Sequence, residues 1–339
     1  MTLQMKLLDQ EGYEQVTEFT DDDGFHCIIS IHNTRLGPAL GGCRLRPYKT
    51  RDDALLDVIR LSKGMTYKSS LAGLNFGGGK CVIIAEKPTR EIMLKLGEAV
   101  NLLNGNFITG EDIGVTLEDV QIAGEVSPHV IHCDGSPMTA RGVVVCMNTA
   151  IDYLRIHRMK TPVWVQGVGK VGIDVARRIY EQNIANRYFG INEFDLQISD
   201  IRPTLIQEAC LSYGATEYNE SNNIDIYVPC AMGQVVNAGN VNLLKYRIIC
   251  GSANNQLVEN EFAEILHANH VLYCPDYLVN AGGVIDAACE IGQPYNRPLS
   301  EQLTNELGER LLNVFKIADD EKITPLAAAN KIAEDRFNS

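Results

Sequence analysis

The stretch "VWVQGVGKVGIDVARRIY", residues 163–180, places glycines at 167, 169 and 172 between two different kinds of sequence. The residues before Gly167 are apolar and mostly β-branched or aromatic, which is typical of a buried strand. The residues after Gly172 read as a helix that buries one face. The stretch therefore predicts a strand, a tight turn and a helix in direct succession.

In this context each glycine of the G-x-G-x-x-G pattern has its own use. Gly167 permits the tight turn, Gly169 lets backbone approach a pyrophosphate, and Gly172 lets the helix pack closely on the strand. The anion would lie at the N-terminus of the helix. We therefore predict a dinucleotide site here rather than a turn without a ligand. The predicted binding loop consists of Gly167, Val168, Gly169, Lys170, Val171 and Gly172.

Asp200 ends the next predicted strand, residues 195–200, and is the expected partner of the cofactor ribose. A carboxylate at this place accepts the 2′-hydroxyl of NAD and repels the 2′-phosphate of NADP. Asp200 lies 28 residues after Gly172, where about 20 is usual. Arg202 could also meet a phosphate. NAD is therefore favoured, and NADP stays an alternative.

Strands and helices keep alternating around this motif. Further strands are predicted at 224–230, 246–251 and 270–276, and helices near 139–157, 203–213 and 258–268. Nearly continuous apolar strands alternating with helices indicate a doubly wound parallel sheet. The turn-rich stretch 126–142 marks a domain boundary. We predict an α/β protein of two domains: a substrate-binding and oligomerisation domain at 1–136, and a Rossmann-type dinucleotide-binding domain at 137–309. A C-terminal return to the first domain is predicted at about 310–339.

In the first domain two lysines, Lys68 and Lys80, lie around a glycine-rich stretch. Lys80 follows Gly77–Gly79, which we expect to leave room for a ligand beside the backbone, and precedes the predicted strand 81–85. A lysine whose charged form is disfavoured by desolvation and by a neighbouring cation can shuttle protons near neutral pH. Two lysines placed in this way favour a chemical site over solvated surface charges.

Composition excludes several classes of protein. The formal net charge of −13 over 339 residues argues against a surface for nucleic acid or anionic membrane. No apolar run is long enough to span a bilayer. The ten cysteines are scattered singly without a CxxC pair or a Cys/His cluster, so we expect reduced thiols and no metal. The start of the chain lacks the apolar core of a secretory signal, so a cytoplasmic location is expected.

Several motifs between about residues 36 and 290 resemble those of the glutamate/leucine/phenylalanine/valine dehydrogenases, and those of the leucine branch best. They are "LGPALGGCRL", "LSKGMTYKSSLAGLNFGGGKCVII", "ITGEDIGVT", "VQGVGKVG", "PCAMGQVVN", "GSANNQL" and "PDYLVNAGGVI". The resemblance implies NAD-dependent oxidative deamination of an L-amino acid to a 2-oxo acid and ammonia.

The resemblance also implies roles for individual residues. Lys68, with backbone near Gly41, would bind the substrate carboxylate. Lys80 would be the catalytic lysine that activates water for attack on the iminium left by hydride transfer. Asp112 would assist proton transfer at the amino group and hold Lys80 in place. Further cofactor and substrate contacts implied by the motifs are Asn254 near the nicotinamide ribose, Asn255 near the substrate, and Cys230 and Ala231 beside the cofactor.

Four positions matching the family's side-chain pocket are apolar: Leu40, Gly110, Val284 and Ala287. Without a cation among them, the distal carboxylate of glutamate would lack a partner. Leu40 and Val284 resemble the leucine type, which favours a branched-chain substrate. Gly110 and Ala287 are small and would enlarge the pocket, so an aromatic substrate, phenylalanine or tryptophan, stays open. A catalytically inactive, nucleotide-sensing relative is a further alternative.

Members of this family associate through the substrate domain, so the resemblance implies a homo-oligomer. The C-terminal segment looks short for the leucine type, which puts an octamer in doubt and leaves a dimer possible. The direction of the reaction stays open, because hydride transfer is reversible and the direction follows metabolite levels.

Overall fold

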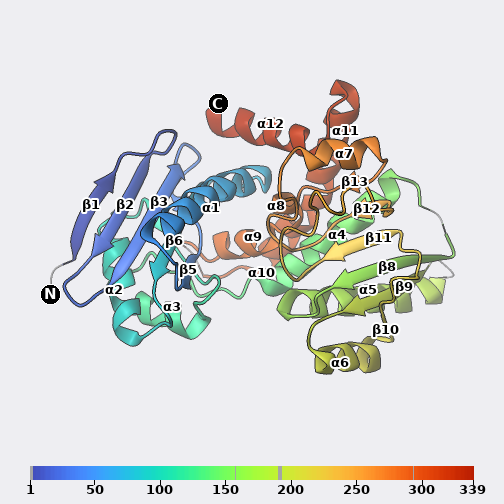
Figure 1. Ribbon diagram of the computed structural model, residues 1–339, viewed down its shortest axis with the longest axis horizontal. Coiled ribbons are helices and arrows are strands. Elements are labelled where there is room, and N and C mark those ends of the chain that lie inside the picture. The colour runs from blue at the N-terminus through green and yellow to red at the C-terminus, as the bar shows by residue number, and fades with distance from the viewer. Residues whose placement is uncertain (1–2, 157, 190–192, 293) are drawn as a thin grey trace. The chain divides into compact units, whose positions relative to one another are not determined.

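The computed structural model describes residues 3–156, 158–189, 193–292 and 294–339 (Figure 1). The chain divides into two compact units. The first comprises the described residues up to Asp134 together with Val284–Arg297 and Ala333–Ser339. The second comprises Gly135–Gly283 and Pro298–Ile332. Of the predicted return at about 310–339, only Ala333–Ser339 is thus part of the first unit.

The first unit is built on a seven-stranded sheet in the order β1-β2-β3-β6-β4-β7, with β5 also paired to β6. Its strands are β1 (Gln4–Leu8), β2 (Gln15–Thr20), β3 (His26–Asn33), β4 (Ala39–Leu40), β5 (Cys43–Arg46), β6 (Gly77–Ile84) and β7 (Phe107–Ile108). The neighbours β1–β2, β2–β3 and β3–β6 pair antiparallel. Strands β4 and β5 run parallel to β6, and β7 runs parallel to β4. The loops that follow β4 and β7 therefore start side by side.

Three glycines, Gly77–Gly79, begin the buried strand β6 instead of forming an open loop before it. A Cβ on Gly77 would collide with the Asn33 carbonyl, and one on Gly78 with the Thr66 backbone N. A Cβ on Gly79 would lie 2.7 Å from the Phe107 ring. The glycines let neighbouring backbone approach β6, so the space expected here for a ligand is filled by the protein itself.

Helices cover both faces of this sheet. They are α1 (Arg51–Leu71) on one face, and α2 (Arg90–Asn101) and α3 (Leu117–Gly124) on the other. Val58 of α1 packs with Val82 of β6, while Cys81 of β6 packs in the core that contains Leu96 of α2. Side chains alternate along a strand, so Lys80 points to the α1 face, as Val82 does.

The C-terminal segment of the chain closes the first unit. In α12 (Pro325–Asn338), Arg336 donates to the carbonyls of Ser70 and Leu74 at 3.2 and 2.8 Å and to Asn75 Oδ1 at 3.0 Å. The last carbonyls of a helix have no partner within the helix. Arg336 therefore satisfies the end of α1 with a side chain from the other end of the sequence.

The second unit contains a six-stranded parallel sheet in the order β10-β9-β8-β11-β12-β13. Its strands are β8 (Lys160–Gln166), β9 (Glu193–Ser199), β10 (Thr216–Glu217), β11 (Ile226–Pro229), β12 (Ile248–Ile249) and β13 (Leu272–Tyr273). The chain builds outward from β8 in one direction and from β11 in the other, so the strand order reverses between them. In such sheets ligands bind at the carboxyl ends of the strands beside the point of reversal. The predicted doubly wound α/β fold is confirmed.

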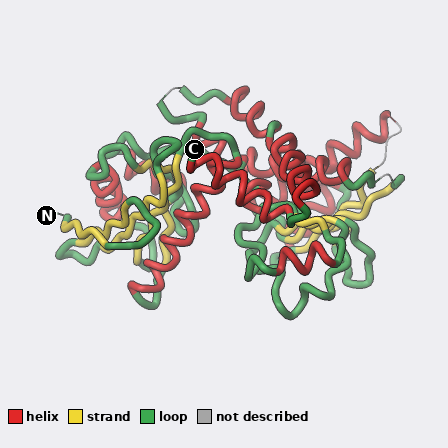
Figure 2. Tube along the Cα trace, turned by 90° about the horizontal axis from the view of Figure 1, so that it is seen from above, coloured by secondary structure: helices red, strands yellow, loops and turns green. Residues whose placement is uncertain are grey.

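The helices of the second unit and of its connections lie on both sides of this sheet (Figure 2). They are α4 (Ser136–Tyr153), α5 (Lys170–Phe189), α6 (Pro203–Tyr213), α7 (Phe262–Ala268), α8 (Asp276–Val279), α10 (Arg297–Asn305) and α11 (Leu307–Glu321). Most of α9 (Gly282–Ala288) belongs to the first unit. The prediction of a helix at 203–213 is confirmed. The helix predicted near 139–157 is α4, and His157 itself lies outside the described residues.

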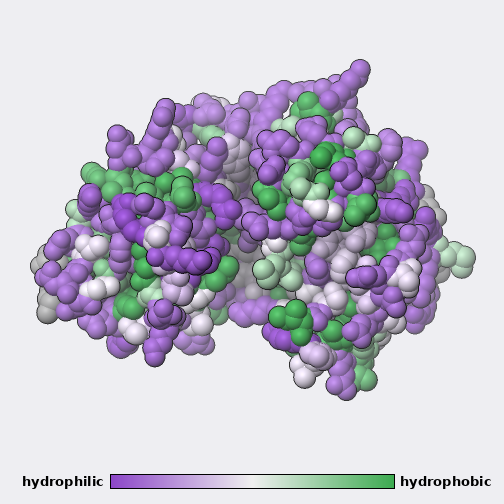
Figure 3. Space-filling view, viewed as in Figure 1, coloured by the Kyte–Doolittle hydropathy of each residue, from purple (hydrophilic) through white to green (hydrophobic). Residues whose placement is uncertain are grey.

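The surfaces of both units are largely hydrophilic in the view of Figure 3, with apolar side chains scattered among the polar ones. Within the described ranges, no helix combines the length and apolar content needed to cross a membrane. All ten cysteines are free thiols, and most are buried.

Candidate active site

The first group of predicted residues gathers on the α1 face of the first sheet. Lys80 Nζ lies 2.6 Å from Asp112 Oδ2. Lys80 comes from β6 and is only 6% exposed, while Asp112 lies in the loop after β7. The structure thus brings together the two residues predicted to be catalytic.

The loop that carries Asp112 is held by close backbone packing. The Cys43 N–H donates to the Gly110 carbonyl at 2.8 Å, and the Val115 N–H donates to the Asp112 carbonyl at 3.0 Å. A Cβ on Gly42 would lie 3.0 Å from Asp112 Cβ. A larger residue at position 42 would therefore displace the carboxylate from Lys80.

The charge of Asp112 follows from its surroundings. Burial raises the pKa of a carboxyl group, but the nearby charges of Lys80 and Arg44 lower it more, and the pKa of Asp112 is about 2. Arg44 Nε donates to the same oxygen, Asp112 Oδ2, at 3.3 Å. At neutral pH Asp112 is therefore ionised, and its negative charge faces Lys80.

Lys68 and the predicted substrate contacts of β4 lie on this same face. Lys68 is in the last turn of α1. Met65, one turn earlier, lies 3.3 Å from where a Cβ on Gly41 would be. Leu40 pairs with Gly78 of β6, and Gly78 packs against α1. The helix therefore carries Lys68 over the part of the sheet that holds Leu40, Gly41 and Lys80.

Gly110 does not border open space on its Cβ side. A Cβ there would lie 2.9 Å from Ile131 Cγ1, because Ile131 N–H donates to the neighbouring Thr109 carbonyl at 2.8 Å. Ile131 was not singled out from the sequence, since its nearness to Gly110 depends on the pairing of two distant loops.

Val284 and Ala287 lie one turn apart on α9, and Val284 is buried. Between them along the chain, Asp286 accepts from Cys133 Sγ at 3.0 Å and from Tyr295 Oη at 2.7 Å. These bonds anchor α9 to the segment before α4. The place of Val284 and Ala287 in a substrate pocket stays a prediction.

In the second unit the three glycines of the predicted binding loop differ in their surroundings. Gly167 has φ +88°, and a Cβ there would lie 2.5 Å from Ala231 Cβ. A Cβ on Gly172 would collide with the Gly167 carbonyl. A Cβ on Gly169 would meet only Arg202 Nη2, at 3.4 Å. The space beside Gly169 is thus open, and α5 begins at the next residue, which fits a pyrophosphate at a helix N-terminus.

Asp200 follows β9 and is bonded to this loop. Its Oδ2 accepts from the Val168 N–H at 2.9 Å, and its Oδ1 accepts from Arg202 N–H at 2.9 Å and from Arg202 Nε at 3.0 Å. The hydrogen bond from the Arg202 side chain is the main reason that the pKa of Asp200 is lowered. A ribose hydroxyl would therefore meet a carboxylate that already has a cation beside it.

Beyond β12, Asn254 and Asn280 form a polar pair suited to a carboxamide. Asn280 is 5% exposed, and its Nδ2 donates to Asn254 Oδ1 at 2.8 Å and to the Ser252 carbonyl at 3.1 Å. Its buried Oδ1 has no donor among the residues that the structure describes. A buried acceptor without a donor is costly, and an N–H of the nicotinamide carboxamide would satisfy it. The sequence placed Asn280 inside a motif but gave it no role.

Asn255 and the pair Cys230–Ala231 lie in the loops around this point. Asn255 is exposed with φ +52°, and its carbonyl accepts from the Gln234 N–H at 2.7 Å. Cys230 and Ala231 directly follow β11, and Ala231 contacts the Gly167 turn as described above. The predicted cofactor residues therefore lie at the carboxyl ends of β8, β9, β11 and β12.

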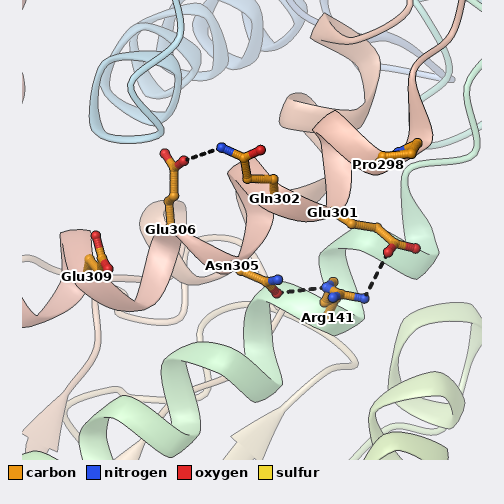
Figure 4. Close-up of a pocket in the computed structure, with 7 residues that line it drawn as sticks. All are labelled: Arg141, Pro298, Glu301, Gln302, Asn305, Glu306 and Glu309. Carbon is orange, nitrogen blue, oxygen red and sulfur yellow. Dashed lines mark hydrogen bonds and ion pairs between the residues drawn. The ribbon is translucent and has the colours of Figure 1, made fainter.

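A separate cavity of about 450 Å³ lies in the second unit (Figure 4). It is lined by Arg141, Pro298, Glu301, Gln302, Asn305, Glu306 and Glu309. Arg141 Nε donates to Asn305 Oδ1 at 2.8 Å, and Nη1 lies 3.7 Å from Glu301 Oε2. None of the residues predicted for the reaction lines this cavity. In the part of the chain that is described, no group of three or more His, Cys, Asp or Glu could hold a metal.

Family models match most of the chain. Residues 12–128 match the dimerisation domain of the Glu/Leu/Phe/Val dehydrogenases. Residues 198–337 match the model described as glutamate/leucine/phenylalanine/valine dehydrogenase. The match to a dimerisation domain indicates a homo-oligomer.

Known relatives extend over the full length of the chain. Phenylalanine dehydrogenase of Caldalkalibacillus thermarum is 38% identical over 97% of this chain and 92% of its own. Leucine dehydrogenase of Bacillus cereus is 37% identical over 100% of this chain and 95% of its own. The crystal structure of L-tryptophan dehydrogenase from Nostoc punctiforme superimposes with a TM-score of 0.83, at 35% identity and 96% coverage of both chains.

These relatives are named for three different amino acids, and their identities to this chain are nearly equal. The comparisons therefore do not favour the leucine branch over the phenylalanine and tryptophan dehydrogenases, although the sequence motifs had led us to expect this. What they share is the reaction: NAD(P)-dependent oxidative deamination of an L-amino acid. The chain therefore belongs to the glutamate/leucine/phenylalanine/valine dehydrogenase family, and it is an amino-acid dehydrogenase, an oxidoreductase that acts on a CH–NH2 group.

Proposed function

We propose that this enzyme uses NAD to deaminate a branched-chain L-amino acid, leucine or valine, reversibly to the 2-oxo acid and ammonia. The observation that carries the proposal is the ion pair of Lys80 and Asp112, at 2.6 Å, on a sheet face that also holds Lys68. Two cations and one carboxylate match a substrate that carries a carboxylate and a nitrogen that changes its charge during the reaction.

Each of these groups has its own task in the proposal. Lys68 pairs with the substrate carboxylate, helped by backbone near Gly41. A bound NAD would supply the acceptor for the hydride of the substrate Cα. Lys80 activates the water that attacks the iminium carbon. Asp112, ionised at neutral pH, assists proton transfer at the substrate nitrogen and keeps Lys80 in position.

The second unit supplies the nucleotide contacts in this proposal. The loop 167–172 and the start of α5 hold the pyrophosphate, and Asp200 accepts from the ribose. Asn254 lies near the nicotinamide ribose and Asn255 near the substrate. Cys230 and Ala231 form the wall beside the Gly167 turn. The open side of Gly169 and the unpaired acceptor of Asn280 support this assignment.

The preference for a branched-chain substrate rests on the apolar positions Leu40, Gly110, Val284 and Ala287. The small size of Gly110 adds little room, because Ile131 occupies its Cβ side. This favours leucine or valine over a bulkier ring. An aromatic substrate is the second candidate, favoured by the small Ala287.

The proposal is tested by following reduced cofactor with L-leucine, L-valine, L-phenylalanine, L-tryptophan and L-glutamate in turn. The highest kcat/KM is expected for leucine or valine. A highest value for phenylalanine or tryptophan would overturn the substrate but not the reaction. NAD binding without turnover of any amino acid would instead indicate a non-catalytic nucleotide-sensing relative.

Shortening Ile131 is expected to shift the preference toward aromatic substrates. Ile131→Ala opens space beside Gly110, and pocket changes of this size alter selectivity by about 1–3 kcal/mol. The ratio of kcat/KM for phenylalanine to that for leucine should rise about tenfold. Ile122→Ala, at a partly buried isoleucine of α3, is the control and should leave the ratio unchanged. An unchanged ratio in Ile131→Ala would remove Gly110 from the proposed pocket.

Arg202 is expected to govern how far NADP can replace NAD. Its guanidinium lies beside Asp200 at the predicted binding loop, where we expect it to meet a 2′-phosphate. Arg202→Ala should lower kcat/KM for NADP about tenfold and change that for NAD by less than about threefold. Steady-state kinetics with both cofactors check this. A loss that is equal for both cofactors would show that Arg202 acts through the shape of the loop.

We also propose that the homo-oligomer is a dimer or an octamer and that the enzyme acts in the cytoplasm. Light scattering on the purified protein would give the number of subunits. A monomer at micromolar concentration would contradict the first of these two proposals.

A further inference from the structure

The Lys80–Asp112 pair is one end of a longer chain of charges in the first unit. Arg44 Nε donates to Asp112 Oδ2 at 3.3 Å, and Arg44 Nη1 donates to Asp57 Oδ2 at 3.0 Å. Tyr48 Oη donates to the same Asp57 oxygen at 2.8 Å. The guanidinium of Arg44 thus joins two carboxylates, one beside the proposed base and one on α1.

The fold explains how Arg44 reaches both. It lies on β5 opposite Val82 of β6, so its side chain points to the α1 face, as that of Lys80 does. Asp57 comes from the second turn of α1 above this face. A planar guanidinium can direct Nε and Nη1 to different acceptors, which an ammonium group on a flexible stem cannot do in the same fixed way.

These groups are shielded from water. The side chains of Arg44 and Asp57 are 11% and 12% exposed, and those of Lys80 and Asp112 are 8% and 19% exposed. Charges interact more strongly in such surroundings than at the surface, and each needs a partner. The network ends at Arg60, which pairs with Asp57 from the exposed side of α1.

We propose that Arg44 is a positioning residue for the deamination: it keeps Asp112 ionised and turned toward Lys80, while Asp57 and Tyr48 hold Arg44 itself in place. This inference rests on the proposed function of the Lys80–Asp112 pair. A purely structural role would be to join β5 to α1, with no effect on the chemistry of Asp112. The low pKa of Asp112, which follows from Lys80 and Arg44 against the opposing effect of burial, supports the first role.

Arg44→Met is the test, because methionine keeps an unbranched apolar stem but removes the charge. We expect kcat to fall about 10- to 100-fold with the KM for the amino acid changed by less than about threefold, since the carboxylate is assigned to Lys68. The titratable groups of β5 and β6 that interact electrostatically with the Asp112 carboxylate are Lys80, Arg44 and the Cys43 thiol. With Arg44 removed, the pKa of Asp112 should rise, and the acidic limb of the kcat/KM profile should move to higher pH with it.

Two further variants complete the experiment. Lys49→Met, three residues after the end of β5, removes an exposed cation, and it should keep the wild-type profile. Arg44→Lys keeps the positive charge but lacks the planar guanidinium that can reach two carboxylates. It should recover part of kcat, and the acidic limb of its kcat/KM profile should lie between those of wild type and Arg44→Met.

The outcomes separate this inference from the proposed function. If the wild type oxidises no amino acid, the proposed function fails and the inference fails with it. If the wild type is active and a folded Arg44→Met keeps the wild-type kcat and pH profile, the inference alone is overturned. If circular dichroism shows that Arg44→Met does not fold, Arg44→Lys decides by the same two measurements, and wild-type values would overturn the inference.

Discussion

Replacing Lys80 with alanine is expected to lower kcat for amino-acid deamination about a thousandfold while leaving the affinity for NAD within about threefold. A positioned acid–base group contributes about 10²–10⁴ to a rate, and Lys80 is the buried cation whose Nζ lies 2.6 Å from Asp112. The nucleotide contacts that we propose come from the second unit, which the substitution does not touch. Steady-state rates from the absorbance of the reduced cofactor and calorimetric titration with NAD check the two parts.

The control for this variant is Lys63→Ala. Lys63 is an exposed lysine of α1 whose Nζ lies 5.8 Å from the centre of the Tyr67 ring, and its removal should leave kcat unchanged. A Lys80→Ala enzyme that retains more than about a tenth of the wild-type kcat would show that another group activates the water. A loss of NAD affinity together with activity would point to misfolding rather than to missing chemistry.

Adding one methyl group at Gly169 is expected to weaken NAD binding at least about tenfold, about 1.4 kcal/mol, without changing the melting temperature. The Cβ of Gly169→Ala would have room in the protein, since the nearest atom is Arg202 Nη2 at 3.4 Å. It would take up the side on which backbone approaches the pyrophosphate. Calorimetry gives the dissociation constant, and thermal unfolding gives the stability.

Gly172→Ala is the matched variant, with the opposite balance of effects. Its Cβ would collide with the Gly167 carbonyl, so α5 would have to move away from β8. We expect a lower melting temperature, and loss of binding as its consequence. If Gly169→Ala bound NAD as the wild type does, the pyrophosphate could not lie at this loop in the way proposed.

Most strands of the second unit could be predicted from sequence, whereas β10, α10 and α11 were not singled out. The strands β8 and β9 are apolar runs that are each followed by a helix, so the signals are local, as at α6 over Pro203–Tyr213. The last strands are shorter than predicted: the runs at 246–251 and 270–276 give only β12 and β13. The apolar runs predict which residues are buried. Hydrogen bonding to the neighbouring strand decides how many of these residues belong to a strand.

The first unit was less predictable because its pairings are distant in sequence. Gly77–Gly79 have no side chains to show periodicity, so the start of β6 could not be recognised. Arg44 lies 68 residues from Asp112 and 13 from Asp57, and no pattern in the sequence joins them. A charged residue between the apolar Cys43 and Leu45 was the available signal, since a cation in a buried strand needs a counter-charge.

The hydrogen bonds of Arg336 have a consequence for the order of events in folding. They join residues 266 and 262 positions apart, at the end of α1 and near the end of α12. During synthesis, therefore, the first unit can receive Ala333–Ser339 only after all residues of the second unit have been made. Bringing such distant segments together costs chain entropy and slows folding. The second unit thus acts as a long insertion in the first, and a fragment that ends at Asp134 would leave the last turn of α1 without its cap.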